Sequence, residues 1–457
     1  MKRILVPVSN SFFVRNFLRT DGLKILLGRP GIELVFLVPK VKLEYYRKEF
    51  SSSRLTFVEM PRQNIAIEKF FKFLETSSVH TRTVLMQQYF YLKRIGAKEN
   101  IVIRFFVFFL SRLLWHLGRF SWWRQLVRFF YVLFREGAFE KILSELKPDL
   151  VFCPTLIYNE FPLLRAAKRK GIKTLGMISS WDNFYSKTFL RVQPDALLVQ
   201  TEYLKSLAHQ LADYPLEKIT VTGVPQYDRY FKKTEIVQRS EFIKGLGGDP
   251  DKKLILYAFS GKLGIDVDFD ILDILSRALQ EGRIPNSAQI LVRPYPKNDF
   301  SPERVFKIKK RYGFLVRQVA GHVGAGKDNW EFEEESLALL GNTLAHSDII
   351  ITMYSTFFIE GAIFNKPLIA VAFDGRHKRD YWNSSRRFFD WNHLADIKKS
   401  GGISIARSEE ELINAVNSYL EDPGNLSEGR KKIAQEQAGF YDGKSAERIA
   451  ESILKFI

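Results

Sequence analysis

Cysteine is nearly absent from this sequence, because Cys153 is the single cysteine among 457 residues. One cysteine excludes an internal disulfide and any site that binds a metal through several thiolates. The seven histidines are scattered and show no metal-ligand spacing. We therefore expect no metal and no other cofactor, and the composition suits the reducing environment of the cytoplasm.

Long uncharged apolar stretches are also missing. A membrane-spanning helix needs about eighteen or more apolar residues, and no window of the sequence approaches that length without a charge. The first residues, MKRILVPVSN, hold only the short apolar run from Ile4 to Val8 and no cleavage pattern. They predict a first strand and not a signal peptide.

The chain does contain enough apolar residues to form large cores. Hydrophobic residues make up 46% and charged residues 26% of the sequence, which predicts two or three folded domains. The 69 lysines and arginines exceed the 51 acidic residues and give a net charge of +18. This excess indicates an anionic partner, and composition leaves nucleic acid, membrane lipid and a phosphorylated substrate open.

Strand and helix patterns alternate along the chain and predict two Rossmann-like α/β domains that face each other across a cleft. The first covers residues 1–238 and the second residues 252–430, and residues 431–457 form a helical tail. Ser9 and Asn10 follow the first strand, at the carboxyl edge where open α/β sheets bind ligands. We assign them to the acceptor side, and a plain helix cap is the alternative for Ser11, the next residue of this loop.

One strand, turn, helix and strand unit stands out in the second domain. Tyr354, Ser355 and Thr356 form its turn, after the apolar run that begins at Ile349. Backbone N–H groups and small hydroxyls at the start of a helix suit a phosphate. Glu360 lies five residues beyond Ser355, where it would meet a ribose. We predict that this unit is half of a nucleotide-donor site.

Two further loops follow strands of the second domain. RPYPKND begins at Arg293, and its prolines fix an extended loop in which Arg293 offers a fork of donors to a phosphate while Tyr295 donates or stacks on a base. A rigid surface turn with a solvated Arg293 is the alternative. Ser260 and Lys262, after an earlier strand, complete the predicted donor-binding set.

The first domain contributes the segment SSWDNFYSK, which follows a predicted strand. Burial beside Trp181 is expected to raise the pKa of Asp182 and make it a general base. Asn183 and Lys187 would position an acceptor or stabilise negative charge. The alternative is an Asx-turn in which these side chains only satisfy backbone donors.

GHVGAGKD nearly matches the phosphate-binding loop of nucleoside triphosphatases. It fails at Asp328, where that loop carries a hydroxyl that ligates magnesium. We therefore interpret it as a flexible loop. The acidic run from Glu331 to Glu335 is interpreted as a solvated face.

Residues 101–136 form a basic and aromatic insertion in the first domain. From Ile101 to Arg135 there are six arginines and twelve Phe, Trp or Tyr residues but no acidic residue, and Gly118 and Ser121 are expected to separate two helices. Each helix would carry an arginine ridge beside a wide apolar face, as in helices that lie in a membrane interface. The alternative is a pair of core-facing helices with solvated arginines. The residues predicted to contact the membrane are Arg104, Arg112, Trp115, Trp122, Trp123, Arg124 and Arg128.

Five motifs resemble, in order and placement, the landmarks of the CDP-glycerol glycerophosphotransferase superfamily. They are WDN with Lys187, GVPQYD from Gly223, RPYP from Arg293, DIIITMYST from Asp348 and DGKSAERIAESI from Asp442. The resemblance spans about two thirds of the chain, from Asp149 onward. It implies the GT-B glycosyltransferase fold and the synthesis of teichoic-acid-type polymers.

Two landmarks depart from the pattern of that superfamily, which typically has W-H-G and R-P-H-P with both histidines implicated in catalysis or donor binding. Here Asp182 and Tyr295 stand at those positions. The resemblance then implies that Asp182 is the base and Tyr295 a non-titrating donor contact. A carboxylate base is usual in inverting GT-B glycosyltransferases, which favours sugar transfer.

We therefore expect an inverting, metal-independent glycosyltransferase, peripheral on the cytoplasmic face of the cell membrane. It would move a sugar from a nucleotide-sugar donor to a lipid-linked or cell-envelope glycan acceptor at an anionic membrane surface. A CDP-glycerol or CDP-ribitol type polyol-phosphate transferase, a nucleotide-sugar 2-epimerase and a non-catalytic membrane or glycan-binding protein are the alternatives. Nucleic acid is not expected as a partner, because no recognised binding module is present.

Overall fold

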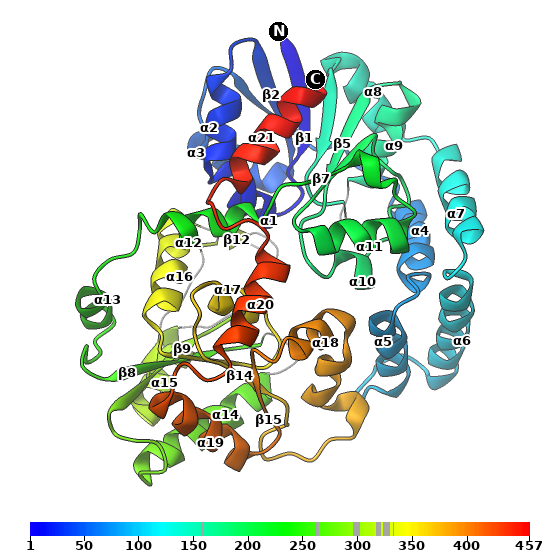
Figure 1. The fold of residues 1–457 in the computed structure, drawn as a ribbon. Coiled ribbons are helices and arrows are strands. Elements are labelled where there is room, and N and C mark those ends of the chain that lie inside the picture. The colour runs from blue at the N-terminus through cyan, green and yellow to red at the C-terminus, as the bar shows by residue number, and fades with distance from the viewer. Residues whose placement is uncertain (157–159, 261–264, 296–301, 317–320, 323–329, 332) are drawn as a thin grey trace.

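The computed structural model describes residues 1–156, 160–260, 265–295, 302–316, 321–322, 330–331 and 333–457. Two parallel sheets with helices packed around them form its two domains (Figure 1). This arrangement confirms the predicted pair of Rossmann-like α/β domains. Lys262 and residues 323–328 of the GHVGAGKD segment lie outside the described residues.

The N-terminal domain contains a seven-stranded sheet in the order β3-β2-β1-β4-β5-β6-β7, and every pair of neighbours is parallel. The central strands are almost continuously apolar, as expected for a parallel sheet with both faces covered. The strands are β1 (Lys2–Pro7), β2 (Ile32–Val38), β3 (Leu55–Glu59), β4 (Leu150–Cys153), β5 (Lys173–Met177), β6 (Ala196–Val199) and β7 (Ile219–Val221).

Three short helical pieces follow β1. A π-helical turn follows the first piece, and the hydroxyl of Thr20 then caps a new helix by accepting the N–H of Gly22. The helical elements are α1 (Ser11–Phe13), η1 (Val14–Leu18), α2 (Asp21–Gly28), η2 (Lys40–Lys42), α3 (Leu43–Glu49), α4 (Ile65–Ser77), α5 (Arg82–Lys93), α6 (Ile101–Leu117), α7 (Ser121–Leu133), α8 (Gly137–Leu146), α9 (Phe161–Arg169), α10 (Asn183–Ser186), α11 (Glu202–Ala212), η3 (Leu216–Lys218), η4 (Pro225–Tyr227), α12 (Asp228–Lys232) and α13 (Arg239–Gly245).

The C-terminal domain contains a six-stranded parallel sheet in the order β10-β9-β8-β13-β14-β15, beside a two-stranded antiparallel sheet of β11 and β12. The strands are β8 (Lys253–Ala258), β9 (Ala288–Arg293), β10 (Leu315–Val316), β11 (Gly321–His322), β12 (Trp330–Glu331), β13 (Ile349–Thr352), β14 (Leu368–Val371) and β15 (Ser404–Ala406). The helices are α14 (Ile265–Gln280), α15 (Pro302–Tyr312), α16 (Glu334–His346), α17 (Phe357–Ile363), η5 (Tyr381–Asn383), η6 (Ser385–Asp390), α18 (Asn392–Lys399) and α19 (Glu409–Glu421).

The last two helices connect the two domains. Helix α20 (Ser427–Ala438) packs on α17 of the C-terminal domain, whereas α21 (Ser445–Phe456) returns to the N-terminal domain and packs on α2 (Figure 1). The carboxylate of Asp228 accepts the backbone N–H groups of Ser445 (3.0 Å) and Ala446 (2.8 Å) at the start of α21. The predicted helical tail is therefore shared between the domains.

Glu331 corrects the expectation that the acidic run is a solvated face. Its side chain on β12 is fully buried, and its carboxylate accepts hydrogen bonds from the Nζ of Lys42 (2.6 Å) and the hydroxyl of Tyr46. Both partners belong to the N-terminal domain. A buried carboxylate is stable there because a lysine compensates its charge.

Helices α6 and α7 confirm the expected break and lie at one edge of the molecule, outside the sheets (Figure 1). Within the described chain no single helix is long and apolar enough to cross a membrane, although this pair, bent by 111°, reaches that length and composition together. A Cβ at Gly118 would lie 1.7 Å from the carbonyl oxygen of Ser78, so only glycine fits at the bend.

The arginines of these helices face the protein, which corrects the prediction that they contact a membrane. Arg104 is buried and donates to the last carbonyl groups of α5. Arg124 and Arg128 both donate to the carboxylate of Asp213, at 2.8 and 3.0 Å. Guanidinium groups favour such sites, since each offers several donors to carbonyl and carboxylate oxygens.

Most of the predicted aromatic contacts also turn inward. The indole N–H groups of Trp115 and Trp123 donate to a backbone carbonyl and to a serine hydroxyl of the same domain, each at 2.9 Å. The guanidinium of Arg112 lies over the ring of Trp115, 4.7 Å from its centroid. Trp122, in contrast, is 57% exposed.

The outer side of α6, α7 and their flanking residues is apolar instead. Fourteen large apolar side chains are exposed there, and we call this set the apolar face. It comprises Ile101, Val102, Ile103, Phe105, Phe106, Phe109, Leu113, Phe120, Trp122, Leu126, Phe129, Phe130, Leu133 and Phe134.

Candidate functional site

Glu160 organises the carboxyl edge of the first sheet, and sequence reasoning missed it. Its buried carboxylate accepts the Ser9 hydroxyl and the N–H groups of Thr155 and Leu156, each at 2.9 Å. It therefore joins the loops that follow β1 and β4. Burial raises the pKa of Glu160 despite these donors. Asn10 caps α1, one residue before Ser11, for which the cap was the alternative.

Asp182 lies at the carboxyl end of β5, as predicted, but its electrostatics differ from the expectation. Its carboxylate accepts hydrogen bonds from the Nζ of Lys187 (2.7 Å) and the hydroxyl of Ser180 (2.6 Å), and the side chain is 21% exposed. Burial acts to raise its pKa, but Lys187, His393 and the two hydrogen bonds lower the pKa to about 2. The expected rise in pKa was wrong because the lysine is so close.

The structure separates Asn183 from the other predicted residues of this loop. Asn183 is fully buried, and its amide points to the carbonyl of Thr155 at 3.5 Å. Trp181 instead packs edge-on against the ring of His393 in the C-terminal domain, with 4.7 Å between ring centroids. Trp181, Asp182 and Lys187 therefore lie together at the boundary between the domains.

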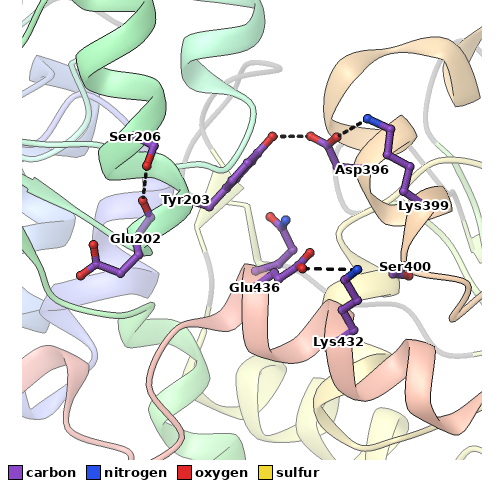
Figure 2. A pocket seen from close by; sticks show the side chains of 9 residues that line it. Glu202, Tyr203, Ser206, Asp396, Lys399, Ser400, Lys432 and Glu436 are labelled. Atoms are coloured by element: carbon purple, nitrogen blue, oxygen red, sulfur yellow. Dashed lines mark hydrogen bonds and ion pairs between the residues drawn. The ribbon is translucent and has the colours of Figure 1, made fainter.

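Hydrogen bonds of Asp396 hold helix α18 at this boundary. Its carboxylate accepts hydrogen bonds from the hydroxyls of Tyr185 on α10 (2.8 Å) and Tyr203 on α11 (2.6 Å). Beside this link lies a cavity of about 420 Å³ between α11, α18 and α20 (Figure 2). It contains none of the residues predicted from the sequence. Its lining is Glu202, Tyr203, Ser206, Asp396, Lys399, Ser400, Lys432, Glu436 and Gln437.

Arg293 lies at the end of β9 and is only 6% exposed, which rules out the solvated surface turn. Its guanidinium lies over the ring of Phe357, 5.0 Å from the centroid. Its Nε is buried and finds no hydrogen-bond partner among the described residues. Burial lowers the pKa of Arg293 to about 10, while Glu360 acts to raise it. The group stays charged at neutral pH.

Glu360 is buried, in contrast to its predicted role as an open ribose contact. One carboxylate oxygen accepts the Tyr230 hydroxyl at 2.7 Å and the other accepts the Thr356 hydroxyl at 3.0 Å. Tyr230 comes from α12, which follows the GVPQYD motif. A ribose would have to displace one of these donors to reach the carboxylate.

The turn before α17 uses much of its own hydrogen-bonding capacity. The hydroxyl of Ser355 accepts the N–H of Phe357 at 3.2 Å, and the carbonyl of Thr356 accepts the N–H of Glu360 at 3.0 Å. The first three N–H groups of α17, on Phe357, Phe358 and Ile359, are therefore engaged by Ser355 and Thr356 and are not free for a phosphate. Tyr354 packs against Phe388, with ring centroids 3.7 Å apart.

Asp268 is a further group that the sequence did not indicate. Its buried carboxyl accepts hydrogen bonds from the hydroxyl of Tyr257 (2.8 Å) and from the N–H and hydroxyl of Ser260 (3.3 Å each). Burial raises the pKa of Asp268 to about 8. Ser260, which was predicted to bind the donor, is therefore hydrogen-bonded to Asp268. Tyr295 is half-buried and packs on the core of its domain.

Arg15 brings a second arginine from the other domain toward this region. It lies on η1 and lines a small cavity together with Tyr230 and Gln226. Burial lowers the pKa of Arg15, and Glu360 is the largest influence that raises it. The π-helical turn that carries Arg15 is a feature often found at functional sites. No motif marked it in the sequence.

Comparison with solved structures identifies the fold. MnaA of S. aureus in complex with UDP aligns with a TM-score of 0.55 at 14% identity and covers 100% of this chain and 98% of that chain. UDP-GlcNAc 2-epimerase from Methanocaldococcus jannaschii aligns with a TM-score of 0.52 at 13% identity. MurG from Acinetobacter baumannii aligns with a TM-score of 0.50 at 12% identity. Each alignment covers 100% of both chains. At these identities the likeness shows the GT-B-type fold alone.

Comparison of sequences identifies the family. The teichoic acid poly(ribitol-phosphate) polymerase of Bacillus spizizenii is 24% identical over 277 residues, which are 56% of this chain and 37% of that protein. The match therefore spans little more than a third of the relative. The profile of the CDP-glycerol:poly(glycerophosphate) glycerophosphotransferase family matches residues 187–455. Because this match covers more than half of the chain, the protein belongs to the CDP-glycerol:poly(glycerophosphate) glycerophosphotransferase family.

Proposed function

We propose that this protein transfers a phosphopolyol from a CDP-activated donor to a cell-envelope glycan or lipid-linked acceptor at a membrane surface. Family membership supports a CDP-linked donor, and the name of the Bacillus spizizenii relative supports a polyol phosphate as the transferred group. The observation that carries the proposal within the site is the state of Arg293.

A buried guanidinium without a compensating partner is costly, because desolvation removes its interaction with water. Arg293 is charged and buried, its guanidinium lies over the ring of Phe357, and its Nε is unpaired in the described part of the chain. A diphosphate supplies the planar, multiple acceptors that an arginine fork binds well. We assign Arg293 to the donor phosphates, with Arg15 approaching from the N-terminal domain. In transfer they would stabilise the departing phosphate.

Transfer of a sugar by an inverting, metal-independent mechanism is the second candidate. It is favoured by the two landmark positions at which Asp182 and Tyr295 replace the histidines typical of the superfamily. Asp182 lies beside Lys187 and Trp181 at the domain boundary, where an acceptor hydroxyl would approach. Among the described residues no three His, Cys, Asp or Glu side chains are grouped as a metal site requires, and metal independence stays a prediction.

A thermal-shift series with the purified protein tests the donor. CMP, CDP, CDP-glycerol and CDP-ribitol should raise the unfolding temperature more than UDP, GDP and their sugar conjugates, because a ligand at about 100 times its Kd stabilises by about 2.7 kcal/mol. A preference for a sugar nucleotide would support the second candidate. Stabilisation by none of these ligands would refute the donor site.

Arg293→Gln should weaken binding of the preferred donor about tenfold or more, because a hydrogen bond to a charged group is worth about 1.5–3 kcal/mol. Titration calorimetry measures this change. Arg407→Gln is the matched control, since Arg407 is an exposed arginine of the same domain. Equal donor affinity in wild type and Arg293→Gln would contradict the assignment.

We place the protein on the inner face of the cell membrane, docked through the apolar face of α6 and α7. Soluble monomers rarely expose a contiguous apolar surface of this kind. No acidic residue occurs between Ile101 and Arg135, and several of the arginines fasten the helices to the protein instead of facing outward. Contact with lipid would therefore depend on insertion of Phe, Trp, Ile and Leu side chains.

Vesicle flotation tests this docking. The pair Phe106→Asp and Phe109→Asp, at 68% and 65% exposed positions, should abolish flotation with vesicles of phosphatidylcholine and phosphatidylglycerol while donor binding is unchanged. Phe306→Asp, at a 61% exposed position of the C-terminal domain, is the control and should float like wild type. Binding should persist in 0.5 M salt, because exposed charges are screened there and apolar contacts are not.

Two results would contradict lipid docking. Release of the wild type by salt would assign membrane binding to surface lysines. A concentration-dependent dimer that the Phe106→Asp, Phe109→Asp variant lacks, without vesicle binding by the wild type, would assign the apolar face to a second copy of the chain.

A further inference from the structure

We propose that His393 of the C-terminal domain accepts the proton of the acceptor hydroxyl during transfer, and that Asp182 positions and stabilises it from the N-terminal domain. This inference rests on the proposed transferase function and adds the identity of its base. It assigns the proton to a residue that no sequence motif marked.

His393 is held directly against the WDN loop. It is the second residue of α18 (Asn392–Lys399), and its ring packs edge-on to Trp181 with 4.7 Å between centroids and near Tyr185 at 6.4 Å. Three residues further along α18, Asp396 binds the hydroxyl of Tyr185 at 2.8 Å. Because Tyr185 belongs to α10, which begins beside Asp182, the same short helix is in contact with both His393 and Asp396.

The imidazole of His393 also has unused hydrogen-bonding capacity. The residue is 9% exposed, and its Nδ1 is buried without a hydrogen-bond partner in the part of the chain that the structure describes. Buried polar atoms are nearly always paired, and an orphan costs about 1–3 kcal/mol. Such a group at a boundary between domains is explained if a substrate pairs with it.

The charges around His393 suit a proton acceptor. Burial lowers its pKa, while Asp182 and Asp396 act to raise it and Lys187 acts to lower it. The imidazole is therefore neutral at neutral pH and free to take a proton. Asp182, with a pKa of about 2, is too weak a base to hold a proton at that pH. Its permanent negative charge instead stabilises the imidazolium that forms.

These groups account for each bond and for the proton in the transfer step. The acceptor oxygen forms a bond to the phosphorus of the transferred group and gives its proton to the imidazole of His393. The bond between that phosphorus and the nucleotide phosphate oxygen breaks, and its electron pair leaves with CMP, whose charge Arg293 would meet. The imidazolium then returns its proton to solvent before the next turnover. In sugar transfer the same proton path holds, with the anomeric carbon in place of phosphorus.

The pH dependence of transfer by the full chain tests the inference. His393→Gln should lower kcat by about 100-fold or more while donor affinity stays unchanged, since a general base contributes about 10²–10⁴-fold. The rise of kcat with pH on the acidic side, which reports the deprotonated imidazole, should disappear from the remaining activity. His377→Gln, at a 63% exposed position of the same domain, is the control and should behave like wild type.

Asp182→Asn gives a second readout that a structural defect would not produce. Without the carboxylate the pKa of His393 falls, so the acidic limb of the kcat profile should move to lower pH while kcat decreases. In His393→Ala, added imidazole should restore part of the activity. This rescue also covers the case in which His393→Gln fails to fold.

The outcomes separate this inference from the proposed function. A wild type that transfers no group from any donor in the panel would refute the function and the base together. An active wild type with a His393→Gln variant of similar kcat and an unchanged acidic limb would overturn the base alone. In that case a group other than His393 would accept the proton.

Discussion

At the residue scale, Arg293 and Asp268 show two ways in which the C-terminal domain accommodates a buried ionisable group. Asp268 can become neutral, and the raised pKa of about 8 means that it keeps its proton at neutral pH. Arg293 cannot lose its charge under the same conditions, even with its pKa lowered to about 10. The carboxyl of Asp268 is therefore accommodated without its charge, whereas Arg293 keeps its charge beside Glu360 and leaves its Nε unpaired among the described residues.

The raised pKa of Asp268 predicts that stability falls as the pH rises from about 4 to about 8. In the unfolded chain its pKa is near 3.8, so the folded protein holds one more proton between about pH 4 and pH 8. The stability associated with this proton is full below pH 4 and is lost as the pH rises through 8. Asp268→Asn removes the titration. The unfolding temperature of the variant should gain about 5 °C on the wild type between pH 6 and pH 9, since 1 kcal/mol corresponds to about 2–4 °C.

Differential scanning fluorimetry over this pH range measures the effect, and Asp251→Asn, at an exposed position, is the control. The difference in unfolding temperature between variant and wild type at each pH removes the contribution of the other titrating groups. A difference that stays constant from pH 6 to pH 9 would show that Asp268 is ionised in the folded protein.

At the element scale, α6 and α7 show what periodicity can and cannot predict. Their bounds followed from the sequence, because glycine at position 118 and the serine at 121 end one helix and begin the next. The predicted orientation of the two helices was inverted, because an amphipathic pattern defines two sides of a helix but does not show which side faces the protein. The partners that decide this, the end of α5 and Asp213, lie elsewhere in the chain.

The candidate site likewise contains residues that the sequence predicted and residues that it did not. Asp182 and Arg293 were found because functional residues follow the carboxyl ends of parallel strands, and strand ends can be recognised from apolar runs. Glu160, Asp268 and His393 were missed, because each derives its character from burial and from partners on other elements. For His393 those partners belong to the other domain. A single histidine between Asn392 and Leu394 near a helix start gave no signal that could mark it as a functional residue.

At the scale of the whole molecule, buried and partly buried polar contacts connect the two domains at several points. Asp396 binds two tyrosines of the N-terminal domain, and Glu331 binds Lys42 and Tyr46. Helix α21 also brings the end of the chain back to the first domain, where it packs on α2. Such contacts set the relative position of Arg15 and Arg293 on the donor side, and of Asp182 and His393 on the acceptor side. Changes far from the site should therefore affect it through domain placement.

The pair of Glu331 and Lys42 gives the sharpest test of this coupling. Both side chains are buried, so removing one partner breaks a buried ion pair, at a cost of about 3–5 kcal/mol. Glu331→Gln and Lys42→Met should each lower the unfolding temperature by several degrees, and the double variant should recover much of the loss because both charges of the pair are removed together. Calorimetry measures the three variants against wild type. Single variants as stable as the wild type would mean that β12 does not hold the two domains together in solution, and the placement of the catalytic groups would then depend on Asp396 and α21.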